Sequence, residues 1–99
     1  MVLSISELSP RSIVRPREGV LARVVGGEMV VLDVGRGLYY GLNEVGTLAW
    51  TLWLEGLTLG EVEARLTAAY EVDAETLCAD LLRLLNDLIA NGLIDVAAG

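Results

Sequence analysis

The candidate reactive groups in this sequence are its carboxylates and one cysteine, and two closely spaced glycines are a candidate for a phosphate-binding loop. With no histidine and only Cys78 as a thiol, a Cys/His or Ser/His nucleophile is excluded, and a zinc site would need carboxylates alone. Asp80 and Asp87 are typical of a solvated helix face. Gly35 and Gly37 precede a strand rather than a helix, so they do not form a phosphate-binding loop. We expect a protein that is not an enzyme on its own and needs no cofactor.

The segment 30–43 predicts a tight hairpin that leads directly into a helix. Two short β-prone runs, 30–32 and 38–40, flank the turn that contains the two glycines. Glycine adopts positive φ readily, as such turns require. Asn43 is a good N-cap for the helical pattern that follows it.

Two further strands and an N-terminal arm are expected around this hairpin. Residues 1–19 mix serine, proline and charge, and we interpret them as an extended arm outside a domain of residues 20–96. Residues 20–25 and 28–34 predict two strands joined at Gly26-Gly27. The third strand is 38–42.

Alternation along a strand assigns its side chains to two faces. On the second strand Asp33 indicates the wetter face, so we expect Val30 and Leu32 to face the helices. On the third strand Tyr40 and Tyr39 lie on opposite faces.

Three helices follow, each with a local signal. Apolar residues from Val45 to Trp53 recur at helical spacing, and the pattern stops at Gly56. Thr58-Leu59-Gly60-Glu61 has the form of a capping box and begins the second helix. The third runs from the Asp73 cap to Asn91-Gly92.

Two apolar surfaces exceed what one helix contact needs. Trp50 and Leu54 lie off the stripe of the first helix, where they either meet a second helix or form an exposed patch that docks a partner protein. Apolar residues of the third helix cover an arc of roughly 160°, wider than the usual stripe. Its excess either meets two other helices or lines a groove beside the third strand.

Charge and hydropathy exclude several classes of partner. The 99 residues carry a net charge of −7, which repels phosphate backbones and argues against nucleic acid. No apolar run approaches the roughly 20 residues of a membrane helix, and the N-terminus does not resemble a signal peptide. A single cysteine fits a reducing compartment, so we expect a cytoplasmic protein with no membrane partner.

The expected fold is α+β and winged helix-turn-helix-like, with a three-stranded antiparallel N-terminal sheet followed by three helices. In a meander the third strand leaves one row of backbone N–H and C=O groups unpaired. An extended peptide could add there as a fourth strand. The same free edge also allows a homodimer.

The sequence contains an ordered set of motifs. They are Val31-Leu32-Asp33, Gly35 to Asn43 with Gly46, Trp50, Gly56-Leu57-Thr58, Tyr70 to Asp73, Asp80, the leucine pairs 81–82 and 84–85, and Gly92-Leu93-Ile94. This set resembles the PqqD-like peptide-recognition domains, which bind leader segments in ribosomal peptide natural-product pathways. The set covers about residues 14–96. Its L-D-x-x-x-G-x-Y-x-x-L-N spacing is similar to the stand-alone leader-binding proteins of lasso peptide biosynthesis. Tyr40 stands where many relatives carry tryptophan.

The resemblance implies a non-catalytic adaptor. It would bind the leader of a ribosomally made precursor peptide by strand addition to the third strand, beside the third helix, and present it to a separate leader peptidase. The implied peptide-binding residues are Val31, Leu32, Asp33, Leu38, Tyr39, Tyr40, Gly41, Leu77, Asp80, Leu81 and Leu84. The flank around Trp50 and Leu54 is then a candidate surface for the peptidase.

Two alternatives stay open. A PqqD-type peptide chaperone for a radical SAM or other modifying enzyme would share the fold and differ in its client. A degenerate winged-helix regulator of transcription is disfavoured, because the last helix is acidic and makes a poor major-groove reader.

Overall fold

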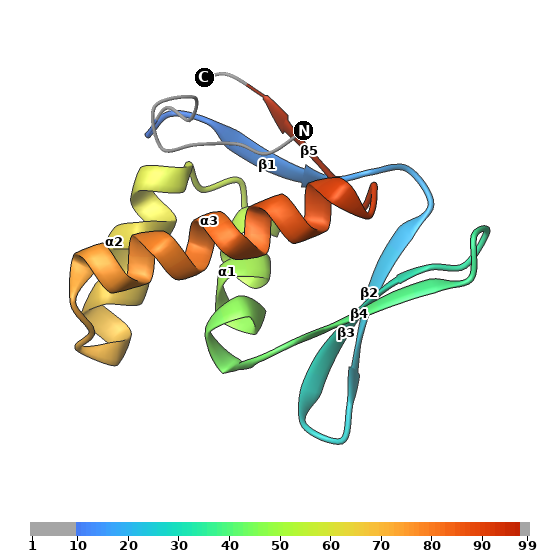
Figure 1. The fold of residues 1–99 in the computed structure, drawn as a ribbon, viewed down its shortest axis with the longest axis horizontal. Coiled ribbons are helices and arrows are strands. Elements are labelled where there is room, and N and C mark those ends of the chain that lie inside the picture. The colour runs from blue at the N-terminus through green and yellow to red at the C-terminus, as the bar shows by residue number, and fades with distance from the viewer. Residues whose placement is uncertain (1–9, 98–99) are drawn as a thin grey trace.

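Five strands and three helices make up residues 10–97, the part of the chain that the computed structural model describes. They are β1 (Ile13–Pro16), β2 (Val20–Val25), β3 (Glu28–Asp33), β4 (Leu38–Leu42), α1 (Glu44–Leu54), α2 (Leu59–Tyr70), α3 (Ala74–Ala90) and β5 (Ile94–Ala97). α3 lies across α1 and α2, and the sheet of β2, β3 and β4 extends from the side of these helices (Figure 1). The expected α+β class with three helices is confirmed.

The strands form two separate sheets, which corrects the expected layout. β2, β3 and β4 form the expected antiparallel meander, while β1 and β5 form a second, two-stranded antiparallel sheet. The sequence did not indicate this second sheet, because β1 is only four residues long and ends in Pro16. A strand this short carries little periodic signal, and its partner lies at the other end of the domain.

Residues placed in the N-terminal arm by the sequence therefore contribute to the core. Val14 of β1 is 1% exposed and belongs to the main hydrophobic cluster. Just before β1, the carbonyl oxygens of Pro10 and Ser12 accept hydrogen bonds of 2.9 Å from the backbone N–H groups of Gly60 and Leu59. These donors lie in the first turn of α2, where N–H groups have no partner within the helix. Residues 1–9 of the expected arm lie outside the described part.

The prediction that Val30 and Leu32 face the helices is wrong. Val31 is fully buried, and β3 pairs it with Tyr40 of β4, so Val31, Asp33 and Tyr40 share the inner face. The two faces of β3 were assigned the wrong way round because Asp33 was taken to indicate the solvent side, whereas its carboxylate is paired with a neighbouring arginine. Its Oδ2 atom accepts a hydrogen bond of 2.7 Å from Nε of Arg36, which allows an acid on that face.

The helix starts are those that the sequence predicts. Asn43 accepts a hydrogen bond from the Gly46 N–H at the start of α1, and Asp73 accepts one from the Thr76 N–H at the start of α3. The capping box of Thr58 and Glu61 is present in full at α2. None of these described helices is long and apolar enough to span a membrane.

We expect that Val14→Ala lowers the free energy of unfolding by about 2 kcal/mol, because two buried methyl groups are lost and a cavity is left. Val24→Ala is the matched control, since Val24 is also a strand valine but is 67% exposed. That change should cost no more than about 0.5 kcal/mol. Chemical denaturation measures both, and equal effects would contradict the packing of β1 into the core.

Candidate functional site

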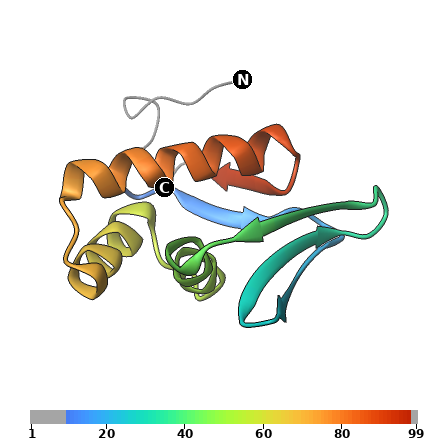
Figure 2. The same ribbon diagram turned by 60° about the horizontal axis from the view of Figure 1, so that its bottom comes forward.

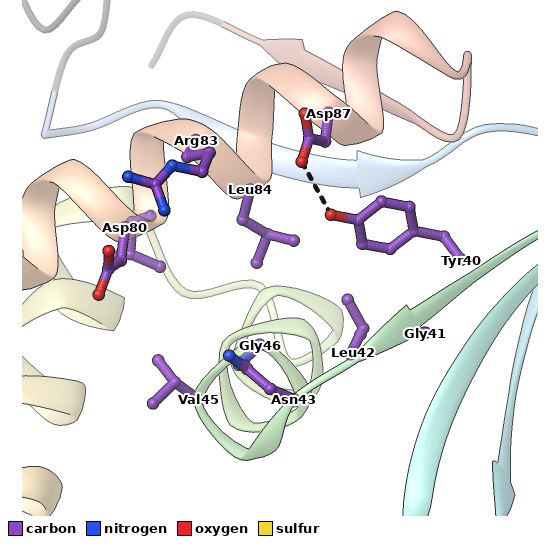
Figure 3. A pocket seen from close by; sticks show the side chains of 11 residues that line it. Tyr40, Gly41, Leu42, Asn43, Val45, Gly46, Asp80, Arg83, Leu84 and Asp87 are labelled. Carbon is purple, nitrogen blue, oxygen red and sulfur yellow. Dashed lines mark hydrogen bonds between the residues drawn. The ribbon is translucent and has the colours of Figure 1, made fainter.

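A cleft of about 310 Å³ opens between β4, the start of α1 and the middle of α3. Its lining residues are Tyr40, Gly41, Leu42, Asn43, Val45, Gly46, Asp80, Leu81, Arg83, Leu84 and Asp87. Figure 3 shows the α3 side chains on one side of the cleft and the β4–α1 junction on the other. The site is thus built from two segments that are some forty residues apart in sequence.

Tyr40 of β4 reaches across one end of the cleft to α3. Its hydroxyl donates a hydrogen bond of 2.9 Å to Oδ2 of Asp87, the dashed line in Figure 3. Burial of the ring, with the nearby Asp87 carboxylate, raises the pKa of the Tyr40 phenol above its usual 10. The shift moves ionisation of this phenol further above physiological pH, where the hydroxyl is already neutral and can donate.

The α3 side of the cleft is an alternation of apolar and charged groups. Leu81 is buried and Leu84 is half-buried, so Leu84 offers apolar surface to the cleft. Asp80, Arg83 and Asp87 surround these leucines at helical spacing. The cleft can thus accept apolar side chains and surround them with polar groups of both signs.

The floor of the cleft is the junction between β4 and α1. Leu42 is buried, and the Oδ1 atom of Asn43 accepts a hydrogen bond of 2.8 Å from the Gly46 N–H. A Cβ atom at Gly46 would lie 3.3 Å from that oxygen and 3.4 Å from Leu42. A larger residue would therefore crowd the cap, which gives the L-N-x-x-G motif a physical reason.

The edge of β4 beside this cleft is unpaired. Among the described strands β4 pairs only with β3, so alternate residues from Leu38 to Leu42 leave their N–H and C=O groups on its outer side. β2 forms the opposite edge of the same sheet. β4 is the edge that adjoins a cavity lined by α3.

The structure brings some of the predicted site residues together and leaves others apart. Those that line the cleft are Tyr40, Gly41, Asp80, Leu81 and Leu84. Those that do not line it are Val31, Leu32, Asp33, Leu38, Tyr39 and Leu77. Val31 and Leu77 are core residues at 0% and 1% exposure, whereas Leu38 and Tyr39 lie on the exposed part of β4.

Sequence reasoning missed several lining residues. They are Leu42, Asn43, Val45, Gly46, Arg83 and Asp87. Asn43 and Gly46 stood in the L-N-x-x-G motif, which signalled a helix start but not a cleft wall. Arg83 and Asp87 lie on the polar face of α3. From sequence alone such a face is assigned to solvent, because the segment that lies beside it is not known.

The two residues predicted to dock a partner, Trp50 and Leu54, differ in exposure. Trp50 is 2% exposed and belongs to the core cluster, so it is not part of an exposed patch. Leu54 is exposed and lines a separate cavity of about 450 Å³ with Trp53 and residues of β1.

The cleft combines apolar surface with the carboxylates of Asp80 and Asp87, the Arg83 guanidinium and the Tyr40 ring. Within residues 10–97 no three histidine, cysteine or acidic side chains lie close enough together to hold a metal ion. Cys78 is half-buried and does not line the cleft. What the geometry provides is a cleft with apolar and charged lining beside a free strand edge.

Comparison with known proteins gives one family and two solved structures. Residues 28–94 match the family model described as coenzyme PQQ synthesis protein D (PqqD). A structure of TbiB1 in complex with the TbiA(beta) leader peptide is 31% identical, covering 82% of this chain and 94% of that chain at a TM-score of 0.75. A lasso peptide synthetase B1 complexed with the leader peptide is 29% identical, covering 83% and 96% at a TM-score of 0.76. The curated proteins give no match.

We expect Asp87→Asn to lower the pKa of the Tyr40 phenol toward 10 without restoring it fully. The change removes the negative charge that disfavours phenolate, while the ring stays partly buried. NMR titration of the tyrosine ring carbons measures this value. Tyr70 is the internal control, because burial raises its pKa too but its neighbour is Glu44. An unchanged Tyr40 titration would show that the hydrogen bond to Asp87 does not form.

Proposed function

The chain belongs to the PqqD family, as a PqqD-like recognition element of ribosomal peptide pathways, and we propose that it is a non-catalytic adaptor for a precursor leader peptide. The observation that carries the proposal is the cleft between α3 and the unpaired edge of β4, in which leucine side chains are surrounded by charged groups. The two similar structures support it, since each is a complex with a leader peptide.

The leader binds as a strand added to β4. Backbone pairing at Leu38, Tyr39, Tyr40 and Gly41 uses the N–H and C=O groups on the free edge. Side chains alternate along such a strand, so every second leader residue points toward α3. Backbone pairing supplies affinity with little sequence preference, and the cleft supplies the preference.

The size of the cleft favours a few anchor side chains rather than a whole peptide. At about 310 Å³ it lies at the lower limit of ligand pockets. Leu81, Leu84 and Val45 provide its apolar surface. Burying a large apolar anchor there contributes roughly 1.5–3 kcal/mol before ordering costs.

The bound leader is presented to a separate peptidase in lasso peptide biosynthesis. The cleft holds carboxylates and an arginine but no nucleophile paired with a base, so the cleavage chemistry belongs to another protein. The family match to PqqD itself favours a second candidate, a peptide chaperone for a radical SAM or other modifying enzyme. The 31% and 29% identities to leader complexes, one of them of a lasso peptide synthetase, favour the first.

The free β4 edge also permits self-association. Two copies could pair through β4, and a leader strand would compete for the same N–H and C=O groups. Sedimentation with and without leader separates the two uses of the edge, because leader should convert any such dimer to a monomer.

The proposal predicts binding of the pathway's leader peptide with a dissociation constant at or below about 1 μM. Fluorescence anisotropy of a labelled leader measures it, with a scrambled leader as the control. Leu84→Ala should weaken binding about tenfold, because it removes apolar surface from the cleft. Leu82→Ala is the matched control, since Leu82 is a half-buried leucine of the same helix that does not line the cleft.

Equal affinity for the leader and the scrambled peptide would contradict the proposal. The peptidase step has its own readout, in which leader removal by the pathway peptidase should be faster with this protein present. Binding without acceleration would favour the chaperone for a modifying enzyme.

A further inference from the structure

The turn end of the β3–β4 hairpin has little apolar packing to hold it in place. Val34 in the turn is 69% exposed, and Tyr39 on β4 is 77% exposed. Figure 2 shows this end of the sheet standing clear of α1 and α2. Because few apolar groups are buried there, hydrophobic packing holds this end of the hairpin less firmly than the end at Tyr40 and Leu42, which packs on the core.

Arg36, at the tip of this hairpin, joins it to the end of α3. Its Nε atom donates a hydrogen bond of 2.7 Å to Oδ2 of Asp33. Its Nη2 atom donates to the carbonyl oxygens of Asn91 at 2.7 Å and Gly92 at 3.1 Å. These carbonyls follow the last turn of α3, where a cation is favoured by the helix dipole.

The surrounding residues fit the guanidinium closely. The hydrogen bond from Arg36 is the main cause that lowers the pKa of the Asp33 carboxyl, which keeps Asp33 charged as an acceptor. Gly92 has a φ of +67°, and a Cβ atom there would lie 3.0 and 3.1 Å from the two terminal nitrogens of Arg36. Glycine at this position thus serves both the backbone turn and the approach of the arginine.

We propose that Arg36 is a positioning residue for leader binding, which holds β4 at the distance from α3 that the leader strand requires. This inference rests on the proposed function. Arg36 does not line the cleft, so it acts through the placement of β4. Together with the Tyr40–Asp87 hydrogen bond, it links the hairpin at two points to α3 and the residues directly after it.

Loss of the Arg36 link should lower the fraction of molecules in which β4 is correctly placed beside α3. Because only these molecules bind leader, the apparent affinity falls with that fraction. If only a tenth of the molecules keep β4 in place, the apparent dissociation constant rises about tenfold. Arg36→Ala should have an effect of this size. Arg36→Lys should fall between the wild type and Arg36→Ala, because an ammonium group lacks the planar fork that reaches Asp33 and the α3 carbonyls together.

The experiment is anisotropy with labelled leader on four variants of the full chain. Arg23→Ala removes the same charge from an exposed position on β2, and its affinity should stay within about twofold of the wild type. Val14→Ala lowers stability from a site outside the cleft and should also keep the affinity. A merely structural role for Arg36 would make its two variants behave like Val14→Ala.

A second measurement uses the protein without leader. NMR relaxation dispersion should detect microsecond-to-millisecond exchange at the Leu38–Leu42 amides in Arg36→Ala and not in Val14→Ala. If the wild type binds leader and Arg36→Ala binds equally well, the inference is overturned. If the wild type binds no leader, the proposed function fails instead. In that case the relaxation-dispersion data without leader test whether Arg36 positions β4. If the Leu38–Leu42 amides of Arg36→Ala show no exchange beyond that of the wild type, this role of Arg36 is overturned.

Discussion

The single residue between β4 and α1 fixes the angle at which the sheet meets the helices. β4 ends at Leu42 and α1 begins at Glu44, so Asn43 must end a strand and cap a helix at once. Its side chain accepts from the Gly46 N–H, and Leu42 is buried beside it. The floor of the cleft is this junction. A longer connection would leave the angle between β4 and α1 less constrained.

The parts of the fold that sequence could predict are those with local causes. Asn43, the Thr58–Glu61 box and Asp73 each satisfy N–H groups within three residues of themselves, so their roles are visible in a short window. The pairing of β1 with β5 joins residues about eighty positions apart and has no such local signal. Helix starts were therefore predictable, and the second sheet was not.

The candidate site shows the same division at the level of single side chains. The wide apolar arc of α3 left two alternatives open, contact with two other helices or a groove, and the family resemblance implied the groove. Asp87 was interpreted as a solvated acid, because its partner Tyr40 lies 47 positions away in sequence. Asp33 was assigned to the wrong face because the polar character of a residue was taken as exposure. Its contact with Arg36 shows that a local ion pair can allow an acid on an inner face.

The β1–β5 sheet bears on how such a domain can be combined with others. The antiparallel register places Ile13 opposite Ala97, so the two ends of the folded unit lie next to each other. Neither residue lines the cleft. Domains with adjacent ends tolerate insertion into a surface loop of another protein, because the host loop needs no widening. This geometry suits insertion or fusion of the folded unit at either end, with the cleft left uncovered.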